Sequence, residues 1–112
     1  MVLDSRMAMS LLPVIMHYLG ADTPFHLIVR TNDNTANGRI ADITFGKVKF
    51  THTLDELLVT VTHQRSQNHL NTYSLPIFEN GKIIGGIAIS VNGKENLETV
   101  ENFLNEFVAQ HF

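Results

Sequence analysis

Asn80-Gly81 separates two long apolar runs, and this dipeptide constrains the fold more than any other feature of the chain. Asn and Gly tolerate the positive φ that a two-residue hairpin turn requires at both central positions. We therefore expect His69 to Phe78 and Lys82 to Val91 to pair as antiparallel strands. The polar stretch Arg65 to Asn68 is expected to be the turn that leads into the first of them.

The N-terminal segment carries apolar residues at helical spacing from Met7 to Leu19. Pro13 is tolerated in the first turn of a helix but is costly deeper inside one. We therefore predict a helix from about Leu12 to Leu19 that ends at Gly20.

Two strands are predicted next, on either side of a loop rich in Asn and Asp at residues 31–38. The first is Phe25 to Arg30, which is apolar and contains β-branched residues. The second is Arg39 to Phe45, in which Ala41, Ile43 and Phe45 alternate onto one face.

The middle of the chain leaves two alternatives open. Thr53 and Glu56 have the spacing of a helix capping box. The β-branched run Val59 to Thr62 favours a strand. We prefer a short helix from about Leu54 to Leu58 followed by a strand to about Gln64, and the alternative is one longer helix to Arg65.

The last segment predicts an amphipathic helix. Apolar residues recur on one stripe, and the glutamates lie mostly off it. The order of elements does not alternate strand and helix, so a parallel doubly wound sheet is not expected. We predict an α+β fold for residues 1–112 as a single domain: an antiparallel sheet of about five strands with N-terminal, short central and C-terminal helices.

Composition excludes several classes of function. The chain has no cysteine, so disulfides and thiolate chemistry are absent. The net charge is −3 without a basic stripe, so we expect no direct binding of nucleic acid. No apolar run approaches the roughly 20 residues of a membrane span, and we expect a cytoplasmic protein. The low charged fraction of 17% also favours a homodimer, although a well-filled core would account for it equally.

No catalytic or metal site is predicted. The six histidines lack helical or finger-like spacing, and His63 and His69 alone would make a poor zinc site. There is no nucleophile elbow and no phosphate-binding glycine loop. We therefore expect that the chain is not an enzyme, and the sequence indicates no cofactor.

The order of elements resembles a PAS domain, and more narrowly the YheO-like PAS domains of bacterial transcriptional regulators. Five stretches carry the resemblance: residues 12–19, 25–30, 40–46, 53–55 and 80–89, the last with a Gly-Lys-Ile-Ile-Gly run. The resemblance implies a sensory domain in signalling or transcriptional control. A bound small molecule would shift the population of conformers and thereby change self-association.

In a PAS-like fold the ligand would lie between the inner face of the sheet and the short helix. Five polar residues are candidates to line that space: His26, Arg30, His52, Thr72 and Tyr73. Arg30 is the best anchor for an anionic ligand, because guanidinium binds carboxylate with two hydrogen bonds. The alternative for each residue is exposure to solvent or an internal hydrogen bond.

Gly85-Gly86 is the other candidate, because glycines inside a strand mark the close approach of another group. That group is either a ligand or, as we prefer, a helix packed on the sheet. The sequence thus leaves a ligand-sensing regulatory domain as the leading hypothesis. A dimerisation or scaffold module without a ligand is the alternative, and a small enzyme is a weaker third.

Overall fold

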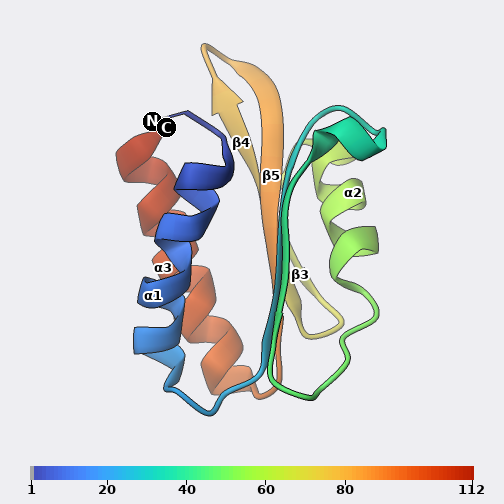
Figure 1. Ribbon diagram of the computed structural model, residues 1–112. Helices are drawn as coiled ribbons and strands as arrows, with labels where there is room; N and C mark the ends of the chain where they lie inside the picture. Colours follow the sequence, from blue (N-terminus) through green and yellow to red (C-terminus); the bar gives the residue numbers. More distant parts are fainter. Residues whose placement is uncertain (1) are drawn as a thin grey trace.

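The computed structural model describes residues 2–112 as one five-stranded antiparallel sheet with strand order β2-β1-β5-β4-β3. Helices α1 and α3 cover one face and α2 lies alone on the other (Figure 1). The elements in chain order are α1 Ser5–Leu19, β1 Phe25–Thr31, the 3-10 turn Ala36–Gly38, β2 Arg39–Phe45, α2 Thr53–His63, β3 Gln67–His69, β4 Thr72–Glu79, β5 Lys82–Val91 and α3 Lys94–His111. The predicted α+β class and antiparallel sheet are confirmed.

The hairpin at Asn80-Gly81 is confirmed. Asn80 has φ of 52° and Gly81 has φ of 77°, as a two-residue turn with positive φ requires. β5 has its predicted bounds and lies at the centre of the sheet, between β1 and β4.

β1 and β2 also form as predicted. Val29 is paired with Ala41, and a bulge follows between Val29 and Arg30. Ile43 and Phe45 pair with Leu27 and Phe25. Ala41 and Phe45 of the predicted apolar face pack on the main core.

The predicted start of α1 is wrong, because the helix begins at Ser5 and encloses Pro13. The side chain of Asp4 accepts a hydrogen bond from the backbone N–H of Met7 at 2.9 Å, which caps the helix about two turns earlier than expected. Pro13 removes only the hydrogen bond to the carbonyl of Met9, a residue 55% exposed, where water can replace that bond.

The preferred short helix followed by a strand is also wrong. The longer-helix alternative is correct, because α2 runs from Thr53 to His63. The capping box does not form: His52 precedes the helix without a side-chain cap. The hydroxyl of Thr53 bonds to Ser90 on the sheet instead.

The strand before the hairpin is divided. The predicted turn at residues 65–68 is wrong in position, because the two-residue turn lies at Leu70 and Asn71, with φ of 53° and 57°. It separates the short β3 from β4.

The α1/α3 side of the sheet contains the main hydrophobic core. The predicted stripe of α3 is confirmed, with Leu97, Val100 and Leu104 buried against the sheet. The α2 side has a much smaller apolar cluster of Ile28, Leu57 and Ala88, beside hydrogen-bonded hydroxyl pairs between α2 and the sheet. Because of this difference, the candidate site is sought on the α2 side of the sheet.

Candidate functional site

Small residues alternate along the face of β5 that α2 covers. Gly86 and Ala88 lie under the helix, and a Cβ at Gly86 would stand 2.9 Å from the Leu57 Cδ1 atom and 3.1 Å from the Val61 Cγ2 atom. The absence of a side chain therefore lets α2 approach the sheet closely. The group that presses on Gly86 is the protein's own helix.

Hydroxyl groups join α2 to the sheet. The Ser90 Oγ atom lies 2.5 Å from the Thr53 Oγ1 atom and 2.6 Å from the Thr72 Oγ1 atom. The Thr60 Oγ1 atom of α2 lies 2.5 Å from the Ser74 Oγ atom of β4. All five residues are buried, so these hydrogen bonds are shielded from water and fix the position of the helix.

A buried carboxylate extends this contact to β3. Glu56 is 6% exposed. The Gln67 Nε2 atom donates to the Glu56 Oε2 atom at 2.5 Å, and His69 Nδ1 hydrogen-bonds to the other carboxylate oxygen. Glu56 therefore ties the short edge strand β3 to α2.

The structure brings some of the predicted ligand residues together. His26, Ser90 and Thr72 lie side by side across β1, β5 and β4 on the α2 side of the sheet. His52 lies next in the chain to Thr53, which bonds to the same Ser90. Thr72, however, is fully buried and bonds within the protein.

His26 forms a hydrogen bond on this face. Its Nε2 atom lies 2.6 Å from the Asp42 Oδ1 atom of the neighbouring strand. The carboxylate is 40% exposed, so the contact lies at the surface, near the open edge of the sheet.

Arg30 lies apart from these residues, at the far end of β1. Its Nη2 atom donates to the carbonyl oxygens of Asp33 at 3.0 Å and Thr35 at 2.6 Å. Hydrogen bonds from the Thr35 amide and hydroxyl lower the pKa of Asp33 below its ordinary value of 3.8. Arg30 thus organises the loop after β1, and its predicted role as an anion anchor remains a prediction.

Tyr73 and Gly85 lie on the opposite face of the sheet, the one that α1 and α3 cover. Tyr73 is 2% exposed, and its hydroxyl donates to the Asn105 Oδ1 atom of α3. Burial raises the pKa of Tyr73 above its ordinary value of 10.0. A Cβ at Gly85 would lie 2.1 Å from the Arg30 carbonyl oxygen and 2.6 Å from the Leu3 Cδ2 atom, so packing against the protein requires this glycine.

The space that a PAS-like ligand would take is thus occupied by side chains. Leu57 and Thr60 are 0% exposed between helix and sheet. Within residues 2–112, every buried side-chain nitrogen or oxygen has a hydrogen-bond partner. The buried polar side chains on this face are therefore already satisfied by the protein itself.

Several of the residues that make this contact were not among the predicted ones: Thr53, Glu56, Thr60, Gln67, Ser74 and Ser90. One signal for them exists in the sequence. Residues 86, 88 and 90 are small at every second position of β5, as are 72 and 74 on β4. Such alternation indicates close packing against another element, here α2.

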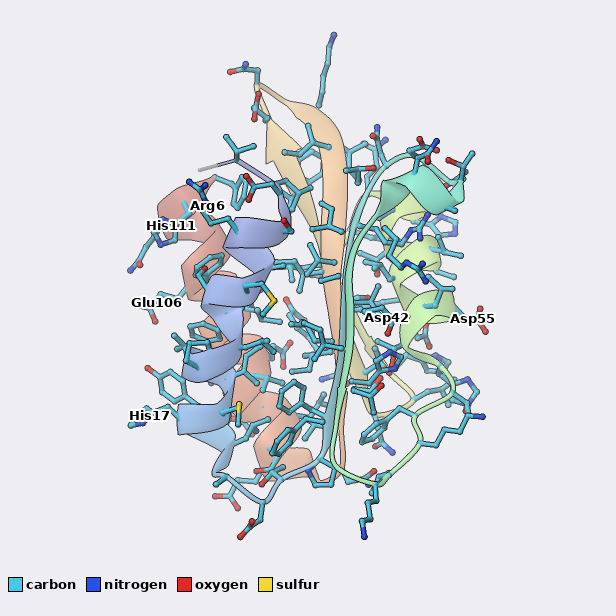
Figure 2. All side chains as sticks on the ribbon, viewed as in Figure 1. Arg6, His17, Asp42, Asp55, Glu106 and His111 are labelled. Carbon is cyan, nitrogen blue, oxygen red and sulfur yellow. The ribbon has the colours of Figure 1, made fainter. Side chains whose placement is uncertain are left out.

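The outer surface of α2, which faces away from the sheet, carries exposed apolar side chains. Leu54 is 42% exposed and Val59 is 40% exposed, and Leu58 between them is half-buried. Asp55 is the one carboxylate on this side of the helix, and Figure 2 shows it pointing away from the sheet. We call Leu54, Asp55, Leu58 and Val59 the α2 outer surface.

Open hollows lie elsewhere on the protein. One of about 700 Å³ lies between α3 and the β3–β4 hairpin, and one of about 250 Å³ lies between α3 and α1. A third, of about 180 Å³, adjoins the start of α2 and is lined by His52, Val48 and Leu70.

For the described part of the chain, no group of three or more possible metal ligands is present. Across the same residues, no helix is long and apolar enough to cross a membrane.

No protein-family model matches the chain, and neither a curated protein nor a solved structure matches it.

Proposed function

We propose that this protein is a non-catalytic regulatory module that acts by pairing with a second copy of itself through the α2 outer surface. The observation that carries the proposal is the exposure of Leu54 and Val59 on a helix whose inner side is already bonded to the sheet. An apolar surface on a rigid helix is typical of an association site.

Two features favour a second copy as the partner. In a two-fold arrangement with the axis perpendicular to α2, the same helix packs against itself in the opposite direction. Asp55 near the start of one α2 would then approach His63 at the end of the other. The two helix dipoles would point in opposite directions, which is the favourable arrangement. The exposed Val48 and Leu70 beside the start of α2 extend the apolar area.

The filled space between α2 and the sheet supports association in preference to ligand sensing. Leu57 and the hydroxyl pairs occupy the region in which a ligand of a PAS-like domain would lie. The sensory and transcriptional roles that the resemblance implies stay predictions. Melting curves with a panel of metabolites distinguish the two, because only a sensor gains stability from one of them.

Light scattering with paired variants tests the proposal. We expect the wild type to be a dimer and the double variant Leu54→Ser with Val59→Ser to be a monomer with an unchanged circular dichroism spectrum. The control is Met9→Ser with Val14→Ser, which removes exposed apolar side chains from α1 on the other face. A monomeric wild type, or equal loss of the dimer in both double variants, contradicts the proposal.

A further inference from the structure

The outer side of α3 is the most strongly charged surface element of the protein. The helix carries Glu95, Glu98, Glu101 and Glu106 against Lys94, so its side chains alone account for a charge of −3. The formal net charge of the whole chain is also −3. Charge elsewhere on the protein therefore balances, and α3 presents the excess.

Two hollows lie on opposite flanks of this helix. Glu98 and Glu101 line the hollow of about 700 Å³ beside the β3–β4 hairpin. Glu106 lines the hollow of about 250 Å³ beside α1. Asn102 lines both, so it separates the two hollows on the exposed side of α3.

Each hollow has groups that suit a cationic side chain. In the larger one, the carboxylates stand among the amide groups of Asn68, Asn102 and Asn105. The carboxylate oxygens and the Asn102 amide oxygen can accept hydrogen bonds from a guanidinium in several directions. Asn105 Oδ1 already accepts from Tyr73, and the Asn68 amide donates to Glu101 at 3.5 Å.

The smaller hollow is lined by aromatic rings as well as by a carboxylate. The rings of Tyr18 and Phe103 lie 5.4 Å apart between centroids, and Tyr18 is 56% exposed. Figure 2 shows Glu106 on the side of α3 turned away from the sheet. A planar cation can contact a ring face while it pairs with the carboxylate, and arginine does both.

We propose that this face of α3 binds an extended segment of a partner protein that places one arginine in each hollow. The hollows flank one helix, so they lie about 10 Å apart. That separation matches arginines three residues apart in an extended segment of polyproline II conformation, in which residues i and i+3 lie on the same side about 9 Å apart. The site lies across the sheet from the α2 outer surface, so it goes beyond the proposed self-association and leaves it unobstructed (Figure 1).

Fluorescence anisotropy with a labelled peptide that contains Arg-Ser-Ser-Arg tests the proposal on the full chain. We expect Glu101→Gln and Glu106→Gln each to weaken binding by about tenfold, the value of one charged hydrogen bond. Tyr18→Leu should remove the preference for this peptide over Lys-Ser-Ser-Lys.

The matched controls are Glu79→Gln and Glu95→Gln, which change charge equally at exposed positions that line neither hollow. They should leave binding within about twofold of wild type, as expected for screened surface charges. Three results overturn the proposal: no binding to wild type, equal weakening in all four glutamine variants, or weakening at only one of the two hollows. Failure here leaves the dimer unaffected, because light scattering reports on the other face.

Discussion

At the scale of single residues, hydroxyl groups hold α2 in place where most helices rely on apolar contacts. Ser90 is central, because its Oγ atom lies within hydrogen-bond distance of both Thr53 and Thr72. A buried hydroxyl that loses its partner incurs the full cost of its desolvation.

Replacing Ser90 with alanine should therefore lower the free energy of unfolding by about 1–3 kcal/mol. The Thr53 hydroxyl would lose its partner, while Thr72 keeps the Leu70 carbonyl as acceptor. Urea unfolding measures the difference. Ser10→Ala on the exposed side of α1 is the control and should change little; a similar loss in both variants would argue against the hydroxyl contact.

Tyr73 predicts a change of stability at alkaline pH. Its pKa in the folded state is raised above 10.0, chiefly by burial. Well below pH 10.0 the Tyr73 hydroxyl keeps its proton in both the folded and the unfolded state. As pH rises above 10.0, the unfolded state loses this proton first, so the free energy of unfolding falls. Tyr73→Phe should flatten this fall in melting curves, while Tyr18→Phe at an exposed position should not. Parallel curves for Tyr73→Phe and wild type contradict the prediction.

At the scale of elements, the two adjacent glycines of β5 serve opposite faces of the sheet. A methyl group at Gly86 would meet the Leu57 and Val61 side chains, which can shift, and would lie 3.0 Å from the Leu75 carbonyl oxygen. A methyl group at Gly85 would meet the Arg30 carbonyl oxygen at 2.1 Å, and backbone yields far less readily.

We therefore expect Gly85→Ala to destabilise the protein more than Gly86→Ala, for which the cost of overpacking is about 1–3 kcal/mol. Chemical denaturation of both variants measures the order. The reverse order would mean that the contact between α2 and β5 is tighter than the contact between β1 and β5.

The elements with strong local signals were predictable from the sequence. Asn80-Gly81 defined the hairpin, and the stripe of α3 defined its buried side. The errors lie where tertiary contacts override local preference. Thr60 favours a strand by propensity, yet it lies in α2, where its hydroxyl hydrogen-bonds to Ser74 of β4. Leu70 adopts positive φ, which its residue type does not indicate.

The candidate site was predictable only in part. Thr72 was expected on the inner face and lies there, and Gly86 was expected to face a ligand or a packed helix and faces α2. Their partners could not be named, because the hydroxyl contacts join residues as far apart in the chain as Thr53 and Ser90. Local patterns do not encode such pairings.

At the scale of the whole molecule, the sheet separates two surfaces of different chemistry. The α2 outer surface is apolar, and the α3 side is acidic. With α2 on one face and α1 and α3 on the other, a pair of molecules joined through α2 would present two acidic surfaces outward (Figure 1).

A measurement of distances between spin labels in the pair tests this arrangement most directly. The chain has no cysteine, so Asp55→Cys on α2 and Met9→Cys on α1 each give a single labelling site. We expect a short distance between the two copies for the α2 label and a longer one for the α1 label. A shorter distance between α1 labels, or no coupling between copies at either position, would contradict self-association through α2.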